Sequence, residues 1–231
     1  MNTVSIKAVV FDAYGTLFDV YSVGALAERL FPGQGAALSV LWRDKQIEYT
    51  RLISLSDPSP VGSRHYQSFW DITRAALRYA MARLALTHTQ AGEDALMAQY
   101  AELAAFAEAH AVLQTLRQRG LATAILSNGS PEMLQSAVHS AGQHALLDVV
   151  LSVDRVRQFK TLPASYQLVL DHFGHAAAEV LFVSSNGWDV MGASWFGFRT
   201  LWVNRQGWPQ ETIGPAPHHT GGDLNAVLSC L

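Results

Sequence analysis

A carboxylate, hydroxyls, an amide and an ammonium occur in this sequence close to where apolar runs end. These side chains are Asp12, Ser127, Asn128, Lys160, Ser184, Asn186 and Asp189. Together they supply a nucleophile or base, a cation that could hold it, and donors for an anion, which are the groups of covalent or acid–base catalysis. Taken singly, Asp12 is also compatible with a turn, Lys160 with a surface lysine and Asp189 with a helix start. The chemical interpretation requires one fold that brings them all together.

Five short apolar runs predict the strands that would position these side chains. They are residues 4–11, 121–126, 147–153, 180–183 and 200–203, whose length and β-branched content are typical of buried strands. Helical patterns between the later runs lie at residues 131–141, 165–173 and 188–195, the first with Ser130 as its N-cap and Pro131 at its first position. This alternation predicts an α/β fold with a doubly wound, parallel, Rossmann-like sheet. Ligands bind outside the carboxyl ends of such strands, where Asp12 and Ser127 would lie.

The segment between the first and second predicted strands has helical patterns in place of strand patterns. Leu41, Trp42, Ile47 and Ile53 belong to one predicted helix, and a second apolar stripe contains Tyr66, Phe69, Trp70, Thr73, Leu77, Ala80 and Leu84. We therefore expect a core domain of residues 1–17 and 104–231, with an inserted helical cap subdomain of residues 18–103. Prolines and glycines in residues 207–222 predict a surface loop.

Composition excludes several classes of protein. Of 231 residues, 49% are hydrophobic and 15% charged, which suits a folded core and excludes disorder, collagen-like repeats and coiled coil. The net charge of −3 without a Lys/Arg cluster argues against nucleic acid or a membrane surface as a partner. The single cysteine, Cys230, excludes an internal disulfide, and the nine histidines lack ligand spacing. No apolar stretch reaches the roughly 18 residues of a membrane helix. With its polar start, the sequence predicts a soluble, cytoplasmic protein.

Four ordered segments resemble the motifs of the haloacid dehalogenase superfamily. They are Phe11–Leu17 (FDAYGTL), Leu126–Gly129 (LSNG), Phe159–Lys160 (FK) and Phe182–Asp189 (FVSSNGWD). Three further segments, Leu41–Arg43, Tyr66–Trp70 and Val203–Gly207, resemble parts of the L-2-haloacid dehalogenases. The similarity to that family extends over nearly the whole chain.

The resemblance implies a covalent mechanism. Asp12 would attack C2 of a small L-2-haloalkanoic acid, expel the halide ion and form an aspartyl ester, which water would hydrolyse to give a D-2-hydroxyalkanoic acid with inversion at C2. The implied catalytic residues are Asp12, Thr16, Lys160, Ser184, Asn186 and Asp189. The implied substrate-binding residues are Tyr14, Arg43, Phe69, Ser127, Asn128, Tyr166 and Trp188.

Within the second set, the resemblance implies different roles. Arg43, Asn128 and the ring edge of Phe69 would hold the halide. Ser127, with the helix start near Ser130, would hold the substrate carboxylate. The other side chains would line the pocket, with Tyr166 also supporting Lys160. By helical spacing alone, Arg43 is also compatible with a solvated surface charge, and Phe69 with a core residue.

Two alternative functions stay open at this point: a phosphatase-like hydrolase of the same superfamily, and a non-catalytic relative. Phosphatase relatives carry a second aspartate at the position of Tyr14 and hold Mg²⁺ through acidic residues where this chain has Ser184–Asn186. Several functional side chains are retained that a non-catalytic protein would not need: Asp12, Arg43, Lys160 and Asp189. We expect no metal and no cofactor. The apolar cap helices and the family resemblance predict a homodimer.

Overall fold

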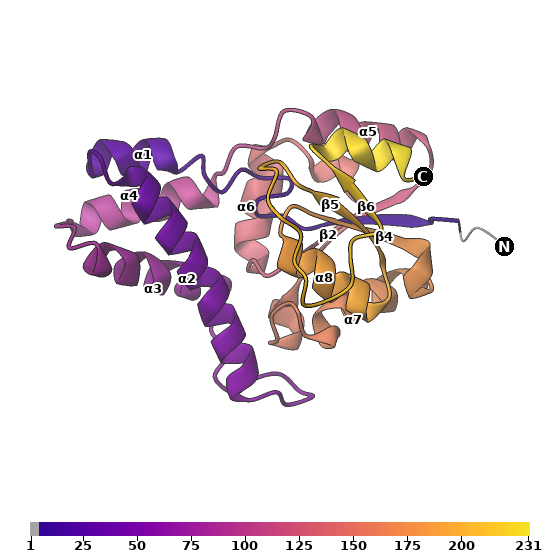
Figure 1. The fold of residues 1–231 in the computed structure, drawn as a ribbon, viewed down its shortest axis with the longest axis horizontal. Helices are drawn as coiled ribbons and strands as arrows, with labels where there is room; N and C mark the ends of the chain where they lie inside the picture. The colour runs from indigo at the N-terminus through magenta and orange to yellow at the C-terminus, as the bar shows by residue number, and fades with distance from the viewer. Residues whose placement is uncertain (1–4) are drawn as a thin grey trace.

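The computed structural model describes residues 5–231 as a parallel sheet flanked by helices, with a helical unit beside it (Figure 1). The strands are β1 (Ala8–Phe11), β2 (Ala122–Ser127), β3 (Val149–Ser152), β4 (Val180–Ser184), β5 (Arg199–Val203) and β6 (His219–Gly221). Their order is β3-β2-β1-β4-β5-β6, and every neighbouring pair is parallel. The predicted α/β fold with a doubly wound, Rossmann-like sheet is therefore confirmed. Val4, at the start of the first predicted strand, lies outside the described residues.

Helices cover both faces of the sheet. They are α5 (Ala109–Gln118), α6 (Pro131–Ser140), α7 (Pro163–Phe173) and α8 (Gly187–Phe196), with short 3₁₀ helices η1 (His144–Leu146), η2 (Val153–Val156), η3 (Ala177–Glu179) and η4 (Leu224–Ser229). In Figure 1, α5 and η4 lie above the sheet, and α7 and α8 below it. The predicted start of α6 is confirmed, because the Ser130 side chain accepts the Met133 N–H and Pro131 follows the cap.

The prediction of a loop over residues 207–222 is wrong at its end. His219–Gly221 form β6, which pairs in parallel with β5 from Leu201↔His219 to Val203↔Gly221. A three-residue strand at the sheet edge has one neighbour and stays largely exposed, so it needs no apolar run in the sequence.

A separate group of helices is inserted between β1 and α5. It consists of α1 (Gly24–Leu30), α2 (Gly35–Ser56), α3 (Phe69–Arg83) and α4 (Gln90–Ala101), and we call it the helical unit (Figure 1). Two members of the predicted apolar stripe lie outside α3: Tyr66 precedes it and Leu84 follows it. The helix begins at Phe69 because the Ser68 hydroxyl caps the Asp71 N–H at 3.2 Å.

The two segments that join the helical unit to the sheet run side by side. Phe18 and Ala105 form an antiparallel bridge. The Asp19 N–H donates to the Ala104 carbonyl at 2.8 Å, and the Phe106 N–H donates to the Leu17 carbonyl at 2.9 Å. The predicted division at residues 17/18 and 103/104 stays a prediction. Across residues 5–231, no helix has the length and apolar character needed to cross a bilayer.

Candidate active site

Three neighbouring strands end at the same edge of the sheet and bring distant residues together. Asp12 follows β1, Ser127 ends β2, and Ser184 ends β4. Because β1 lies between β2 and β4 and all three are parallel, these residues meet at one edge. Lys160 joins them from the segment after η2. The arrangement places Asp12 at the centre.

Lys160 holds two carboxylates. Its Nζ lies 3.0 Å from Asp12 Oδ1 and 2.9 Å from Asp189 Oδ2. All three side chains are almost completely buried, with exposed fractions of 6% for Asp12, 2% for Lys160 and 0% for Asp189. Burying an ammonium this deeply requires opposite charges and hydrogen bonds, and the two carboxylates provide both charges and accept two of its three N–H donors.

The second oxygen of Asp12 is held by two neutral donors. Thr16 Oγ1 donates to Asp12 Oδ2 at 3.2 Å, and Asn186 Nδ2 donates to the same oxygen at 2.8 Å. Thr16 is itself fixed, since its hydroxyl oxygen accepts the Ser185 N–H at 2.9 Å. Ser184 acts one step further away, accepting the Asn186 N–H at 3.1 Å. The Asp12 carboxylate therefore has a fixed orientation.

The three charged groups alter one another's protonation. Burial alone would lower the pKa of Lys160, but the Asp12 and Asp189 carboxylates outweigh it and raise that pKa, so the side chain stays an ammonium. Burial, together with the nearby Asp12 charge, raises the pKa of Asp189 to about 6, although Lys160 and Tyr166 oppose the rise. Mild acid therefore protonates Asp189 more easily than an ordinary aspartate.

Tyr166 lies behind the trio. Its hydroxyl donates to Asp189 Oδ1 at 2.8 Å, and its ring packs among Phe182, Phe196 and Phe198. Burial and the Asp189 charge raise the pKa of this phenol, so it remains a donor. The structure therefore places Tyr166 in support of Asp189, and through Asp189 of Lys160.

The start of α6 forms a second side of the site. Ser127 Oγ accepts the Gly129 N–H at 3.1 Å, which leaves its hydroxyl proton free to donate to a ligand. Asn128 Oδ1 accepts the backbone N–H of Lys160 at 3.0 Å. A side chain at Gly129 would meet the Tyr14 ring at 2.7 Å, so that ring lies directly on this loop. A helix N-terminus with an adjacent hydroxyl suits an anionic group.

The helical unit supplies the remaining side. Arg43, on α2, donates from Nη2 to the Tyr14 carbonyl and to Asn186 Oδ1, both at 3.3 Å. It therefore points into the site, and the alternative of a solvated surface charge does not describe it. Asn186 joins Arg43 to Asp12. The Phe69 ring lies 5.8 Å from Tyr14 and 6.4 Å from Phe159, measured between ring centroids, and so faces the loops of the core.

A cleft of about 800 Å³ opens beside this centre. Arg43, Asn186 and Trp188 all line it, and Trp188 packs against Arg51, whose guanidinium carbon lies 5.4 Å from the ring centroid. Asp12 is absent from its walls. A small molecule entering the cleft would therefore meet Arg43 and Asn186 before it reached the carboxylate.

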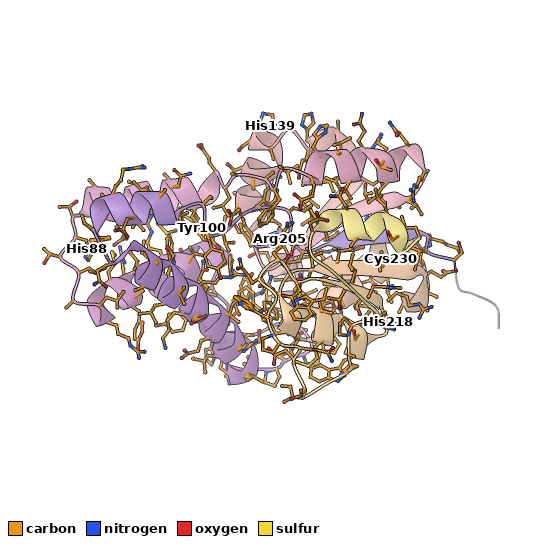
Figure 2. The ribbon with its side chains drawn as sticks, turned by 45° about the horizontal axis from the view of Figure 1, so that its top comes forward. His88, Tyr100, His139, Arg205, His218 and Cys230 are labelled. Carbon is orange, nitrogen blue, oxygen red and sulfur yellow. The ribbon has the colours of Figure 1, made fainter. Side chains whose placement is uncertain are left out.

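Sequence reasoning missed two residues. Tyr100, on α4, stacks on Tyr14 with ring centroids 5.7 Å apart. Arg205 pairs with Glu108 at 2.7 Å and lies 3.6 Å over the Phe106 ring, where it braces a connecting segment. Figure 2 shows Tyr100 on the side of the helical unit that faces the sheet, and Arg205 at the adjoining side of the core. Arg205 lies in Val203–Gly207, a segment that resembles part of the L-2-haloacid dehalogenases, and this resemblance could have drawn attention to it. Nothing in the sequence singles out Tyr100.

The donor set at the centre is poorly suited to a metal ion. Lys160 already occupies the position between the two carboxylates, and the other polar groups beside Asp12 are a hydroxyl and an amide. Among the residues that the structure describes, no group of three or more His, Cys, Asp or Glu side chains is placed to hold a metal ion. A buried carboxylate held by three donors, with a guanidinium nearby, is instead equipped for nucleophilic attack.

Comparisons with known proteins agree with this geometry. The family profile of the haloacid dehalogenase-like hydrolases matches residues 6–197. The (S)-2-haloacid dehalogenase of Pseudomonas sp. (strain YL) is 42% identical over 223 residues, which cover 96% of this chain and 93% of that protein.

Two solved structures are also similar. The L-2-haloacid dehalogenase RSc1362 superposes with a TM-score of 0.95 at 58% identity, covering 98% of both chains. The L-2-haloacid dehalogenase of Xanthobacter autotrophicus, solved with chloropropionic acid covalently bound, superposes with a TM-score of 0.87 at 39% identity, covering 96% of both chains.

Proposed function

This chain belongs to the haloacid dehalogenase-like hydrolases, and within that family we propose that it is an enzyme that hydrolyses the carbon–halogen bond of small L-2-haloalkanoic acids. The products are a halide ion and a D-2-hydroxyalkanoic acid. The observation that carries this proposal is the setting of Asp12. Lys160, Thr16 and Asn186 fix both of its oxygens, and Asn186 connects it to Arg43 of the helical unit.

In the first step, Asp12 attacks C2 and the C–halogen bond breaks. The substrate carboxylate lies on the Ser127 hydroxyl and the amides at the start of α6. The halide departs toward Arg43, Asn128 and the Phe69 ring edge, where the guanidinium meets the developing negative charge. Because the carboxylate and halide positions are both fixed, only one enantiomer presents C2 to Asp12. Tyr14 and Trp188 line the pocket around the substrate.

In the second step, water hydrolyses the aspartyl ester at the Asp12 carbonyl. Lys160 stabilises the charge that develops on the carbonyl oxygen, and Asp189 holds Lys160 in place. Thr16, Ser184 and Asn186 keep the ester oriented, while Tyr166 supports Asp189. Carbon C2 takes no part in this step, so its configuration inverts once over the whole reaction.

A phosphatase-like reaction fits the site less well. Phosphatases of this superfamily would need an acid at the position of Tyr14, but that side chain stacks on Tyr100 and Phe69 in an aromatic interface. The Lys160 ammonium also stands between the carboxylates that would otherwise bind Mg²⁺. A non-catalytic role does not require a fully buried Lys160 between two carboxylates, which is costly to bury.

Halide release from racemic 2-chloropropionate tests the proposal. We expect chloride release to stop at half of the racemate, because only the L enantiomer reacts, and to be unchanged by EDTA. Reaction of both enantiomers, or a need for added Mg²⁺, would contradict the assigned site. Phosphate release from a phosphomonoester without chloride release would favour the phosphatase-like alternative.

Replacing Arg43 by lysine tests the halide side. We expect this variant to lose about 2 to 4 kcal/mol of transition-state stabilisation, comparable to one oxyanion donor, which corresponds to a fall in kcat of about 30- to 1,000-fold. An ammonium is a compact, strongly hydrated charge and lacks the planar guanidinium whose Nη2 donates to both the Tyr14 carbonyl and Asn186. Arg83→Lys, at the exposed end of α3, is the matched control. Equal turnover by both variants would remove Arg43 from the halide site.

A homodimer and a cytoplasmic location are also part of the proposal. The homodimer is supported by apolar side chains exposed on the helical unit, namely Val40, Leu52, Leu55 and Tyr79. The location is supported by the content of a single cysteine, because proteins of oxidising compartments commonly carry cysteines paired in disulfides. Light scattering and cell fractionation would check them.

A further inference from the structure

A series of hydrogen-bonded polar side chains, which we call the polar series, crosses the interior of the helical unit. The Tyr100 hydroxyl donates to Gln46 Oε1 at 3.3 Å, and Gln46 Nε2 donates to Thr73 Oγ1 at 2.8 Å. These residues come from three different helices, α4, α2 and α3. Gln46 and Thr73 are fully buried, and Tyr100 is 2% exposed. Tyr100 contacts the site derived above through its ring stack on Tyr14, and none of the three takes part in the proposed reaction.

Both ends of the polar series reach residues on the halide side of the site. At one end, Thr73 Oγ1 donates to the backbone carbonyl of Phe69 at 2.6 Å, one turn earlier on α3. At the other end, the Tyr100 ring stacks on that of Tyr14, whose backbone carbonyl accepts a hydrogen bond from Arg43. Burial raises the pKa of Tyr100, although the Arg43 guanidinium opposes that rise, so the hydroxyl stays protonated and can donate. The donors therefore run in one direction, from Tyr100 through Gln46 and Thr73 to the Phe69 carbonyl.

The polar series also fixes how α2, α3 and α4 are rotated against one another. Trp42, next to Arg43 in sequence, donates from Nε1 to the Thr73 carbonyl at 2.8 Å, and its ring packs 5.3 Å from that of Tyr100. A buried polar group is costly unless its hydrogen bonds are made, so a small rotation of any of these helices would leave Gln46 or Thr73 unpaired. An apolar core would allow such rotations more readily.

We propose that Tyr100, Gln46 and Thr73 are positioning residues that set the distance between Arg43 and Phe69, and thereby the stabilisation of the departing halide. They touch neither substrate nor halide and act through the two residues that do. This inference rests on the proposed function, because the spacing of Arg43 and Phe69 matters in this way only when a halide leaves between them.

The choice of halogen gives this proposal a specific readout. Chloride is a poorer leaving group than bromide, so cleavage of the C–Cl bond depends more on stabilisation of the leaving ion. A misplaced Arg43 should slow release of chloride more than release of bromide. A purely structural defect, which only lowers the fraction of folded enzyme, would slow both in equal proportion.

Single-turnover halide release from L-2-chloropropionate and L-2-bromopropionate tests the inference in two variants. Tyr100→Phe keeps the ring stack on Tyr14 and removes only the hydroxyl, and Thr73→Val keeps the side-chain volume and removes the hydrogen bonds. We expect each to slow chloride release about tenfold and bromide release clearly less, as a small displacement of a catalytic group would. Thr73→Ser restores the hydroxyl and should restore the wild-type ratio. Tyr49→Phe, which removes a hydroxyl on α2 outside the polar series, should leave both rates unchanged.

The outcomes separate this inference from the function on which it rests. If Tyr100→Phe and Thr73→Val slow the release of the two halides equally, or lower only Tm, the polar series has a structural role alone and the inference is wrong. If Thr73→Val does not fold, Tyr100→Phe alone decides between these results. If wild-type enzyme releases neither halide, the proposed function itself fails, whatever the variants do.

Discussion

Asp12→Asn is expected to abolish turnover, with a loss of at least about 10⁴-fold in kcat. An amide oxygen is too weak a nucleophile to displace halide from C2, so no ester forms. The substitution keeps the shape of the side chain, and Lys160 retains Asp189 as a partner, so we expect the variant to fold. Steady-state halide release measures the loss. Asp171→Asn, on the exposed face of α7, is the matched control and should have wild-type activity.

Loss of activity alone does not distinguish a nucleophile from a general base, but the path of oxygen does. If Asp12 forms the ester, the product hydroxyl oxygen comes from Asp12 and the water oxygen enters the carboxylate. A single turnover in ¹⁸O-labelled water should therefore label the peptide that contains Asp12, and leave the hydroxy acid unlabelled. The product should have the D configuration. Label in the hydroxy acid after one turnover would mean that water attacks C2 directly and that Asp12 acts as a base.

The part of the site that lies on the sheet could be predicted because strand ends are visible in the sequence. Asp12, Ser127 and Asn186 follow short apolar runs, and parallel strands bring such positions to one edge whatever the loops between them do. Lys160 was harder to place, since it follows a 3₁₀ helix instead of a strand. Its role came from the family resemblance, and the contacts with Asp12 and Asp189 agree with that role.

The part contributed by the helical unit could be predicted only incompletely. Periodicity identified the helices that carry Arg43 and Phe69, but helical spacing does not say which face meets the sheet. That depends on the path of the two connecting segments and on contacts such as the Tyr100–Tyr14 stack. Gln46 and Tyr100 therefore looked like ordinary helix residues. β6 was missed for a different reason, because a short edge strand has almost no buried side chains to mark it.

Lys160→Met should have the second-largest effect, on stability as well as on activity. Methionine fills similar space but leaves the Asp12 and Asp189 carboxylates facing each other in a buried site. Removing one partner from a buried ion pair costs about 3 to 5 kcal/mol. We expect kcat to fall by roughly 10³-fold or more, because the ammonium that stabilises charge on the ester carbonyl is lost. Lys7→Met, which breaks only a surface pair with Glu179, should leave stability nearly unchanged.

The pH dependence of the stability lost in Lys160→Met shows whether an unpaired carboxylate charge causes the loss. Without Lys160, burial and the Asp12 charge still raise the pKa of Asp189, and the ammonium no longer opposes them. Asp189 then favours folding only while it is protonated, and that contribution disappears as the pH rises through its folded-state pKa. The difference in Tm between wild type and Lys160→Met should therefore be small near pH 5 and widen toward pH 8. A constant difference would mean that the variant disturbs packing and does not leave two carboxylates unpaired.

In wild-type enzyme, the same three groups predict an acid limit to activity. The pKa of Asp189 is raised to about 6, so protonation of Asp189 below that pH weakens its hold on Lys160. We expect kcat/KM to fall below about pH 6, as Asp189 takes up a proton. Asp189→Asn removes the group with the raised pKa, so its residual activity should lose this acid limb. If Asp189→Asn shows the same fall in kcat/KM at acid pH, another group titrates there. The proposed pH-dependent pairing of Asp189 with Lys160 would then be wrong.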